Sequence, residues 1–213
     1  MKKHIVCFGD SNTHGYNGDT LGRFDENERW TCLLQKLLGN DYLVLEEGLS
    51  GRTTVFDDPL HECMSGLDSI YSCLMSHEPV DLLIIMLGTN DTKERFSVTP
   101  EAIGIGMQRL IKKAKSLEEA WRDGKANILI VTPKNIDDEY EQTECAAPMG
   151  LGCAARSRGL HLAFKQAAEL LNCHYLNAND YVSNNNKTDY MHIDLQGHKE
   201  LADALCNKIK EII

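Results

Sequence analysis

The sequence predicts an α/β fold of three layers, in which a five-stranded parallel sheet lies between two layers of helices. Short apolar runs rich in β-branched residues alternate along the chain with segments of helical apolar period. The first of these runs contains no polar residue and the third contains only one, as is typical of parallel strands buried on both faces. No repeat or linker interrupts the alternation, so we expect residues 1–213 to form one domain.

The predicted strands are short apolar runs that lead into glycine, proline or asparagine. The first, Ile5–Phe8, is apolar throughout and stops at Gly9. The third is the most apolar stretch of the sequence and is interrupted only by Asp81, which indicates a central strand. In chain order the predicted strands are residues 5–8, 42–46, 80–87, 127–132 and 173–176.

Amphipathic helices are predicted between and after these strands. Asp58 and Pro59 provide an N-cap and a first-turn proline for the second helix. The third keeps its apolar stripe as far as Trp121, with Lys112 and Lys113 on a solvated face. In chain order the predicted helices are residues 30–38, 58–74, 103–121, 160–171 and 195–212. Right-handed crossovers then favour a flavodoxin-like sheet, in which ligands bind beyond the carboxyl ends of the strands.

The composition is that of a globular protein with an acidic surface. Apolar residues make up 42% and charged residues 25% of the chain, which excludes disordered and fibrous classes. The formal net charge is −10, whereas binding to a phosphate backbone needs a basic face, so we expect no nucleic-acid partner. The apolar run after Lys3 is too short for a signal peptide or a membrane span. We therefore expect a cytoplasmic protein without a membrane partner.

The eight cysteines contain no C-x-x-C pair, so we expect no structural zinc site. Their number is also too small for a disulfide scaffold in a chain of this length. Most of them lie in apolar periodic stretches, which indicates free thiols packed in the core of a protein in a reducing compartment.

Polar loops that contain glycine follow the first three predicted strands. They are Gly9–Asn12, Gly48–Thr54 and Gly88–Asp91. Parallel strands have their carboxyl ends at one edge of a sheet, so we expect these loops to lie together. Glycine lets the backbone approach a ligand closely, so N–H groups can be directed at an anion. The same residue types also make ordinary turns, so no single loop decides between the two interpretations.

Asp189 and His192 form the fourth polar element, in the loop before the last helix. A carboxylate can accept the Nδ1 proton of an imidazole three residues away and leave Nε2 free as a base. The pair therefore supplies two groups of a catalytic triad, although such pairs are often structural. A second pair, Asp194 with His198, is less favoured because helix geometry turns His198 along the last helix.

Together and in this order, the four elements resemble the sequence blocks of the GDSL, or SGNH, hydrolase family. The run from Glu46 to Thr54 is similar, more narrowly, to the branch of arylesterases and acyltransferases. The resemblance implies one SGNH hydrolase domain with a flavodoxin-like fold. Many members have proline after the histidine, whereas this chain has Ile193.

The resemblance also implies roles for individual residues. Ser11 would be the nucleophile, His192 its base and Asp189 the residue that orients the base. The oxyanion hole would consist of the Ser11 and Gly51 backbone amides and the Asn90 side chain. No metal and no organic cofactor is expected. The implied function is hydrolysis of small carboxylic esters, or transfer of their acyl group, through an acyl-enzyme on Ser11, in a chain that forms a homo-oligomer.

Two other functions stay open at this point. A metal-dependent phosphotransferase would use Asp10 as nucleophile beside Mg²⁺, but Asn12 stands where that chemistry expects a second aspartate. A non-catalytic module that binds a small ligand at the same edge would not need the serine, the asparagine and the Asp–His pair together. No G-x-S-x-G elbow occurs, and the match of residues 150–155 to G-x-G-x-x-A does not follow a strand.

Two further segments are candidates for the walls of a pocket at this edge. They are the loop between Thr13 and Trp30 and the segment around Met149. The acidic loop 137–144 is more typical of a solvated loop than of a cation site, and we assign it no role.

Overall fold

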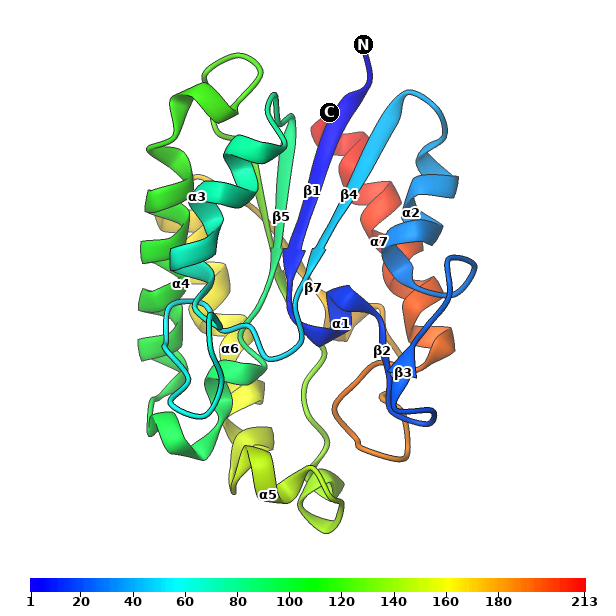
Figure 1. Ribbon diagram of the computed structural model, residues 1–213, viewed down its shortest axis with the longest axis vertical. Helices are drawn as coiled ribbons and strands as arrows, with labels where there is room; N and C mark the ends of the chain where they lie inside the picture. Colours follow the sequence, from blue (N-terminus) through cyan, green and yellow to red (C-terminus); the bar gives the residue numbers. More distant parts are fainter.

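A computed structural model describes residues 1–213 and shows a parallel sheet between two layers of helices (Figure 1). The sheet has five strands in the order β4-β1-β5-β6-β7, which confirms the predicted fold class. The strands are β1 (Lys3–Gly9), β4 (Tyr42–Gly48), β5 (Leu82–Met86), β6 (Ile128–Thr132) and β7 (His174–Asn177).

The strand order reverses at β1. This strand pairs in parallel with β4 and with β5, so Gly9 lies opposite Gly48 on one side and Met86 on the other. From β1 the chain adds β4 on one side and the remaining strands on the other. Such a reversal opens a crevice at the carboxyl ends of the strands. In Figure 1 the loops that follow β1, β4, β5 and β6 gather beneath these ends.

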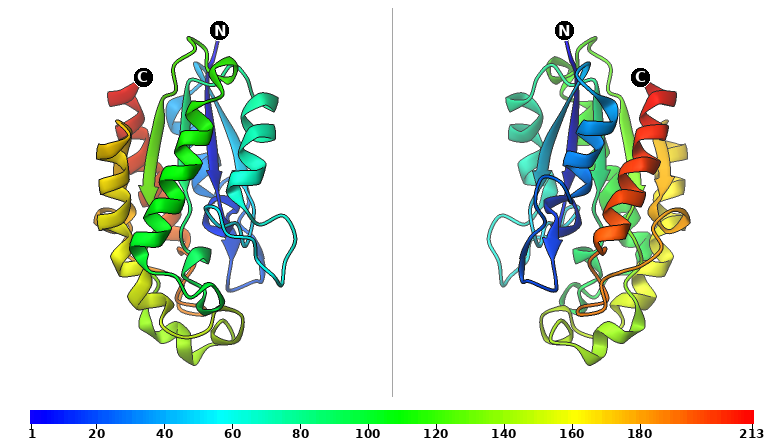
Figure 2. Two further views of the ribbon diagram at one scale, coloured as in Figure 1. Left: turned by 90° about the vertical axis from the view of Figure 1, so that its left-hand side faces the viewer. Right: turned by 90° about the vertical axis from the view of Figure 1, so that its right-hand side faces the viewer.

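The helices cover both faces of the sheet (Figure 2). One face carries α2 (Trp30–Leu38) and α7 (Leu195–Ile212), and the other carries α3 (Gly66–Ser76), α4 (Pro100–Lys115) and α6 (Cys153–Leu170). None of these helices has the length and apolar character needed to cross a membrane.

Side chains of β1 alternate between two hydrophobic cores, because successive strand residues point to opposite faces. Val6 and Phe8 pack with α3, α4 and α6, whereas Ile5 and Cys7 pack with α2 and α7. The strand that leads into the first polar loop is therefore held from both sides.

The second predicted helix begins later than expected, because its predicted cap makes tertiary contacts instead. Asp58 lies in a loop before α3, where Oδ1 accepts a hydrogen bond from the Leu60 amide at 3.0 Å. Its Oδ2 is bound by Lys93 at 2.9 Å and Arg95 at 2.8 Å. The expected helix start at Asp58 was wrong, since this buried ion pair competes with capping.

The third predicted helix ends earlier than expected, and the fourth begins earlier. α4 ends at Lys115, and Trp121 returns to the same core after a 3₁₀ turn, η3 (Glu118–Ala120). The apolar stripe is thus continuous in space although the helix is not. The fourth predicted helix, α6, starts at Cys153 instead of residue 160.

The shortest elements were not predicted, because two to five residues are too few to show a period. They are α1 (Ser11–His14), the ribbon of β2 (Tyr16–Asn17) and β3 (Gly22–Arg23), α5 (Ala146–Met149), and 3₁₀ turns that include η1 (Asn90–Thr92).

Candidate active site

Ser11 is the first residue of α1, and a single residue, Asp10, separates it from the end of β1. Asp10 caps this short helix, since its Oδ1 accepts a hydrogen bond from the Asn12 amide at 3.0 Å. Gly9 is required at the strand end, because a Cβ there would lie 2.0 Å from Thr13 Oγ1. The turn therefore places the serine at the carboxyl edge of the sheet, with its own N–H at an unpaired helix start.

Ser11, His192 and Asp189 form a continuous hydrogen-bonded line. The Nε2 atom of His192 lies 2.8 Å from Ser11 Oγ, and its Nδ1 lies 2.9 Å from Asp189 Oδ2. All three residues are buried, with 5–9% of their surface exposed. An acceptor at Nδ1 favours the tautomer in which Nε2 can accept the serine proton.

Asp189 holds the histidine loop as well as the imidazole. Its Oδ1 accepts hydrogen bonds from the amides of Met191 and His192, both at 2.9 Å. Burial opposes ionisation of this carboxyl, but the hydrogen bonds and the charge of His192 outweigh it and keep the pKa of Asp189 below its usual value. The aspartate is therefore an anion that faces the imidazole.

Asn12 joins the nucleophile turn to the histidine loop. Its Oδ1 accepts a hydrogen bond from the Ile193 amide at 3.0 Å, across 181 residues of sequence. The carbonyl of Asn12 accepts a second one from the indole of Trp30 at 3.0 Å. The ring of Tyr16 packs against the imidazole of His192, with the two ring centroids 4.6 Å apart. These contacts fix the distance between the serine and the histidine.

Gly51 and Asn90 lie in the same pocket as Ser11 and His192. Gly51 has a φ of +92°, in the region that favours glycine, and a Cβ there would lie 2.9 Å from Met64 Sδ. Asn90 begins η1, and its Nδ2 donates a hydrogen bond to the Arg52 carbonyl at 3.2 Å. The structure thus brings together all five residues that the sequence analysis singled out.

A buried carboxylate anchors the loop that contains Gly51. Asp91 Oδ1 accepts a hydrogen bond from the Thr54 amide at 2.9 Å and also binds the Thr54 hydroxyl. Burial, opposed by these hydrogen bonds, raises the pKa of Asp91 to about 6. Arg52 fastens the same loop to β1, because its guanidinium donates to the Gly9 carbonyl at 3.0 Å.

The pocket has a volume of about 250 Å³ and mostly apolar walls. Tyr16 and Met149 lie in it, which confirms the two expected wall segments. Lys93 is a wall residue that no sequence signal indicated, and its ammonium is bound to Asp58. The remaining lining residues are Ser50, Cys145, Pro148 and Met191.

The two rival sites take structural roles. Asp194 caps α7 through the Gly197 amide at 2.7 Å, and His198 accepts a hydrogen bond from the Trp30 amide at 3.1 Å, so they form no dyad. Asp10, the nucleophile of the phosphotransferase alternative, is fully buried as the N-cap of α1, so a substrate cannot reach it. The acidic loop contributes surface contacts such as Asp138 with Arg158.

The fold, with a serine, a histidine and an aspartate in contact at the carboxyl edge of its sheet, defines the class of flavodoxin-like ester hydrolases. More narrowly, the chain belongs to the GDSL-like lipase/acylhydrolase family, whose model matches residues 7–200. A search of curated proteins found no match.

Solved structures agree with this assignment over the whole chain. An aryl esterase from M. smegmatis is 31% identical, with a TM-score of 0.88 over 99% of this chain and 100% of that one. A carbohydrate acetylesterase from Sinorhizobium meliloti is also 31% identical, with a TM-score of 0.88 and full coverage of both chains. A lipase/acylhydrolase from Enterococcus faecalis, 18% identical with a TM-score of 0.70 over 98% of this chain and 96% of that one, shares the fold. The protein is therefore a carboxylic ester hydrolase.

Proposed function

We propose that the protein cleaves small carboxylic esters through an acyl-enzyme on Ser11. The observation that carries the proposal is the unbroken line from Ser11 Oγ through the imidazole of His192 to Asp189. A serine hydroxyl is a weak nucleophile unless a base removes its proton during attack. His192 Nε2 is within hydrogen-bond reach to do so, and Asp189 orients the ring.

Attack of Ser11 on the ester carbonyl produces a tetrahedral oxyanion. The Ser11 amide, the Gly51 amide and the Asn90 side chain donate hydrogen bonds to this oxygen. Because the donors belong to the α1 turn, a glycine-dependent turn and η1, they need no reorganisation as charge develops. His192 then gives its proton to the leaving alcohol.

Release of the acyl group repeats the same chemistry with a second nucleophile. His192 removes a proton from water, which attacks the acyl-serine and frees the acid. An alcohol that takes the place of water receives the acyl group instead, so hydrolysis and transfer share one intermediate. Neither step uses a metal or an organic cofactor.

We assign short-chain esters as the substrate class. The cavity of about 250 Å³ is below the usual size of a drug-like ligand site, and Met149, Met191 and Pro148 give it apolar walls. Such a cavity accommodates an acetyl-sized group or one a few carbons longer. The aryl esterase and the carbohydrate acetylesterase named above support the same class.

A panel of activated esters with graded acyl length tests class and acyl preference together. We expect turnover to be highest for the shortest acyl groups and to vanish in Ser11→Ala. Ser72→Ala, an exposed serine on α3, is the matched control and should keep wild-type turnover. Retention of the wild-type rate by Ser11→Ala would contradict the proposal.

Trapping the intermediate tests the mechanism separately. A rapid quench during turnover, followed by peptide mass spectrometry, should find one acyl group on the peptide that contains Ser11. His192→Ala should abolish this labelling, whereas His61→Ala, an exposed histidine, should not change it. Label on any other residue would contradict the assignment of the nucleophile.

Two broader proposals concern the chain as a whole. We propose that residues 1–213 form a single SGNH hydrolase domain, supported by the single large sheet and the family match to residues 7–200. Limited proteolysis should then leave one resistant core.

We also propose a cytoplasmic location, since all eight cysteines are free thiols and four of them are buried. Cell fractionation tests it.

A further inference from the structure

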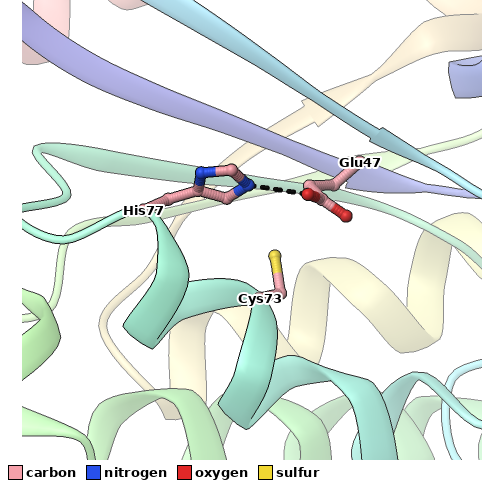
Figure 3. A group of neighbouring side chains, drawn as sticks. All are labelled: Glu47, Cys73 and His77. Atoms are coloured by element: carbon pink, nitrogen blue, oxygen red, sulfur yellow. Dashed lines mark hydrogen bonds and ion pairs between the residues drawn. The ribbon is translucent and has the colours of Figure 1, made fainter.

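Glu47, Cys73 and His77 form a cluster on the α3 side of the sheet (Figure 3). Glu47 lies near the end of β4, Cys73 is in α3, and His77 is the residue that caps α3. One ligand atom of each residue lies within 4.8 Å of the others. Figure 3 shows the thiol directed toward the paired imidazole and carboxylate.

The cluster follows from two periodicities that meet at one point. Cys73 and His77 are four residues apart, so they share one face of the end of α3. Leu45 packs into the core beneath α3, and Glu47, two residues further along β4, points to the same face. On this face of β4 the carboxylate of Glu47 therefore directly follows the apolar side chain of Leu45.

The cluster is open to solvent on one side. β4 is an edge strand, and the side chains of Glu47 and His77 are 30% and 24% exposed. Cys73 is buried behind them. His77 Nε2 and Glu47 Oε1 are 2.6 Å apart, and His4 Nδ1 lies 3.4 Å from the His77 carbonyl. An ion can therefore reach the thiol past the two outer side chains.

We propose that Glu47, Cys73 and His77 bind a transition-metal dication of the Zn²⁺ type, with water as fourth ligand. Thiolate, imidazole and carboxylate are the ligand types that Zn²⁺ takes in proteins. Tetrahedral coordination at Zn–ligand distances of roughly 2.0–2.3 Å places ligand atoms roughly 3.3–3.7 Å apart. Small rotations of the two partly exposed side chains, Glu47 and His77, close the cluster to this size.

Charge balance favours the dication. Binding replaces the Cys73 thiol proton, which passes to solvent, so the carboxylate and the thiolate together neutralise the ion. Burial and the charge of Glu47 raise the pKa of Cys73 to about 12, and Arg52 opposes this shift. Arg52 is 6% exposed, its Nε has no hydrogen-bond partner, and its charge favours the thiolate. The metal ion supplies the remaining stabilisation of the thiolate.

The site lies outside the catalytic pocket, since none of its three residues lines that pocket. Arg52 connects the two regions, because its guanidinium also binds the Glu47 carbonyl and the residue follows Gly51. The proposed ion is therefore separate from the ester chemistry and next to the loop that contains Gly51.

Cobalt(II) is the probe that reports a thiolate ligand directly. Protein freed of metal with a chelator, kept reduced, is titrated with Co²⁺, and Zn²⁺ affinity is measured by competition. We expect one Co²⁺ per chain with thiolate-to-cobalt charge-transfer absorption, which is lost in Cys73→Ser. Glu47→Gln and His77→Gln should each weaken Zn²⁺ binding about tenfold or more.

Three control variants separate this site from other metal ligands. Cys63→Ser and His61→Ala remove exposed ligands near α3, and Cys145→Ser removes the thiol that shares a pocket with His192. All three should keep the cobalt absorption and the Zn²⁺ affinity of the wild type. Cobalt absorption that persists in Cys73→Ser, or is lost in Cys145→Ser, would overturn the assignment.

Thermal unfolding guards against variants that simply fail to fold. The wild-type midpoint should rise on addition of Zn²⁺, because a ligand that binds only the folded state stabilises it. His77→Gln changes a partly exposed side chain, so its metal-free midpoint should stay near that of the wild type while the Zn²⁺-dependent rise becomes clearly smaller at the same Zn²⁺ concentration. An equal rise in both proteins would also overturn the proposal.

Discussion

Asp189 combines two tasks in one carboxylate, since Oδ1 accepts hydrogen bonds from the backbone of the loop around His192 and Oδ2 accepts one from the imidazole Nδ1. The substitution Asp189→Asn separates these tasks, because the amide oxygen still accepts from the backbone while the NH₂ group faces Nδ1. The imidazole is then held in the wrong tautomer. We expect kcat to fall by about 10⁴, as in other Ser–His–Asp triads.

Steady-state kinetics on a short activated ester, with circular dichroism as a folding control, checks this prediction. The variant should retain its fold, because the two backbone hydrogen bonds to Oδ1 survive. A loss of kcat smaller than tenfold would mean that Asp189 is only a loop anchor.

Asn90 has a structural and a proposed catalytic hydrogen bond, because its NH₂ group has two protons. One is donated to the Arg52 carbonyl, and the other is free for the oxyanion. We expect Asn90→Ala to lower kcat by about 10²–10³, which corresponds to about 2.7–4 kcal/mol of transition-state stabilisation, with little change in KM.

Titration of active sites with an acylating probe distinguishes the two roles of Asn90. Turnover is measured per labelled Ser11, so a smaller amount of folded protein does not lower the measured value. If the variant turns over normally per labelled site, Asn90 is structural and the oxyanion hole has one donor fewer.

At the scale of elements, His198 joins α7 to the start of α2 as a neutral acceptor. Its Nδ1 accepts the Trp30 amide, and burial, aided by the charge of His192, lowers its pKa from 6.5 to about 3. The unfolded chain takes up this proton at a higher pH than the folded one. The contribution of His198 to stability is therefore present above pH 6.5 and is lost as pH falls toward 3.

Denaturant unfolding at pH 7.5, 6 and 5 tests this linkage in the wild type and in His198→Asn, whose amide oxygen can still accept from Trp30. We expect the free energy of unfolding of the wild type to fall relative to the variant by up to about 1.4 kcal/mol per pH unit below 6.5. Burial raises the pKa values of Asp10 and Asp91 to about 6. Both carboxyls are present in both proteins, so their contributions cancel in the difference between the two free energies of unfolding. Parallel curves would exclude a proton-linked role for His198.

Local signals predicted the long elements and failed where a tertiary contact competed with them. Trp30–Leu38 was predicted to its ends, because an amphipathic stripe and Gly39 act within a few residues. Asp58 was misassigned because its carboxylate binds Lys93 and Arg95, 35 and 37 residues away. Capping propensity contributes about 1 kcal/mol, which a buried ion pair with two cations can override.

For the whole molecule, we expect ester hydrolysis to survive exhaustive chelation. The proposed chemistry uses an imidazole and a carboxylate where a metallohydrolase uses a cation. The proposed metal site of Glu47, Cys73 and His77 lies outside the pocket and is not required for a step of this chemistry.

The effect of chelation is tested by measuring turnover before and after dialysis against a chelator, with and without added Mg²⁺. We expect equal kcat in all samples. Loss of activity that Mg²⁺ restores would support a metal-dependent reaction in place of the serine mechanism.

The sequence alone determined the fold class and the edge of the sheet at which we propose the chemistry, and its resemblance to a known family singled out the five proposed catalytic residues. Apolar period identifies strands and helices from neighbouring residues, and a parallel sheet then brings the loops after its strands to one edge. Asp189 and His192 are three residues apart, so their meeting could be expected from the sequence. Their contact with Ser11 could be expected only from the resemblance of the four blocks to a known family.

Only the tertiary structure decided which distant side chains meet. Glu47 and the pair Cys73 and His77 come from different elements, and nothing local in the sequence connects them. Lys93 enters the pocket because Asp58, from another loop, binds its ammonium. Such contacts depend on the order of the strands and the path of each crossover, whereas periodicity and capping act over a few residues.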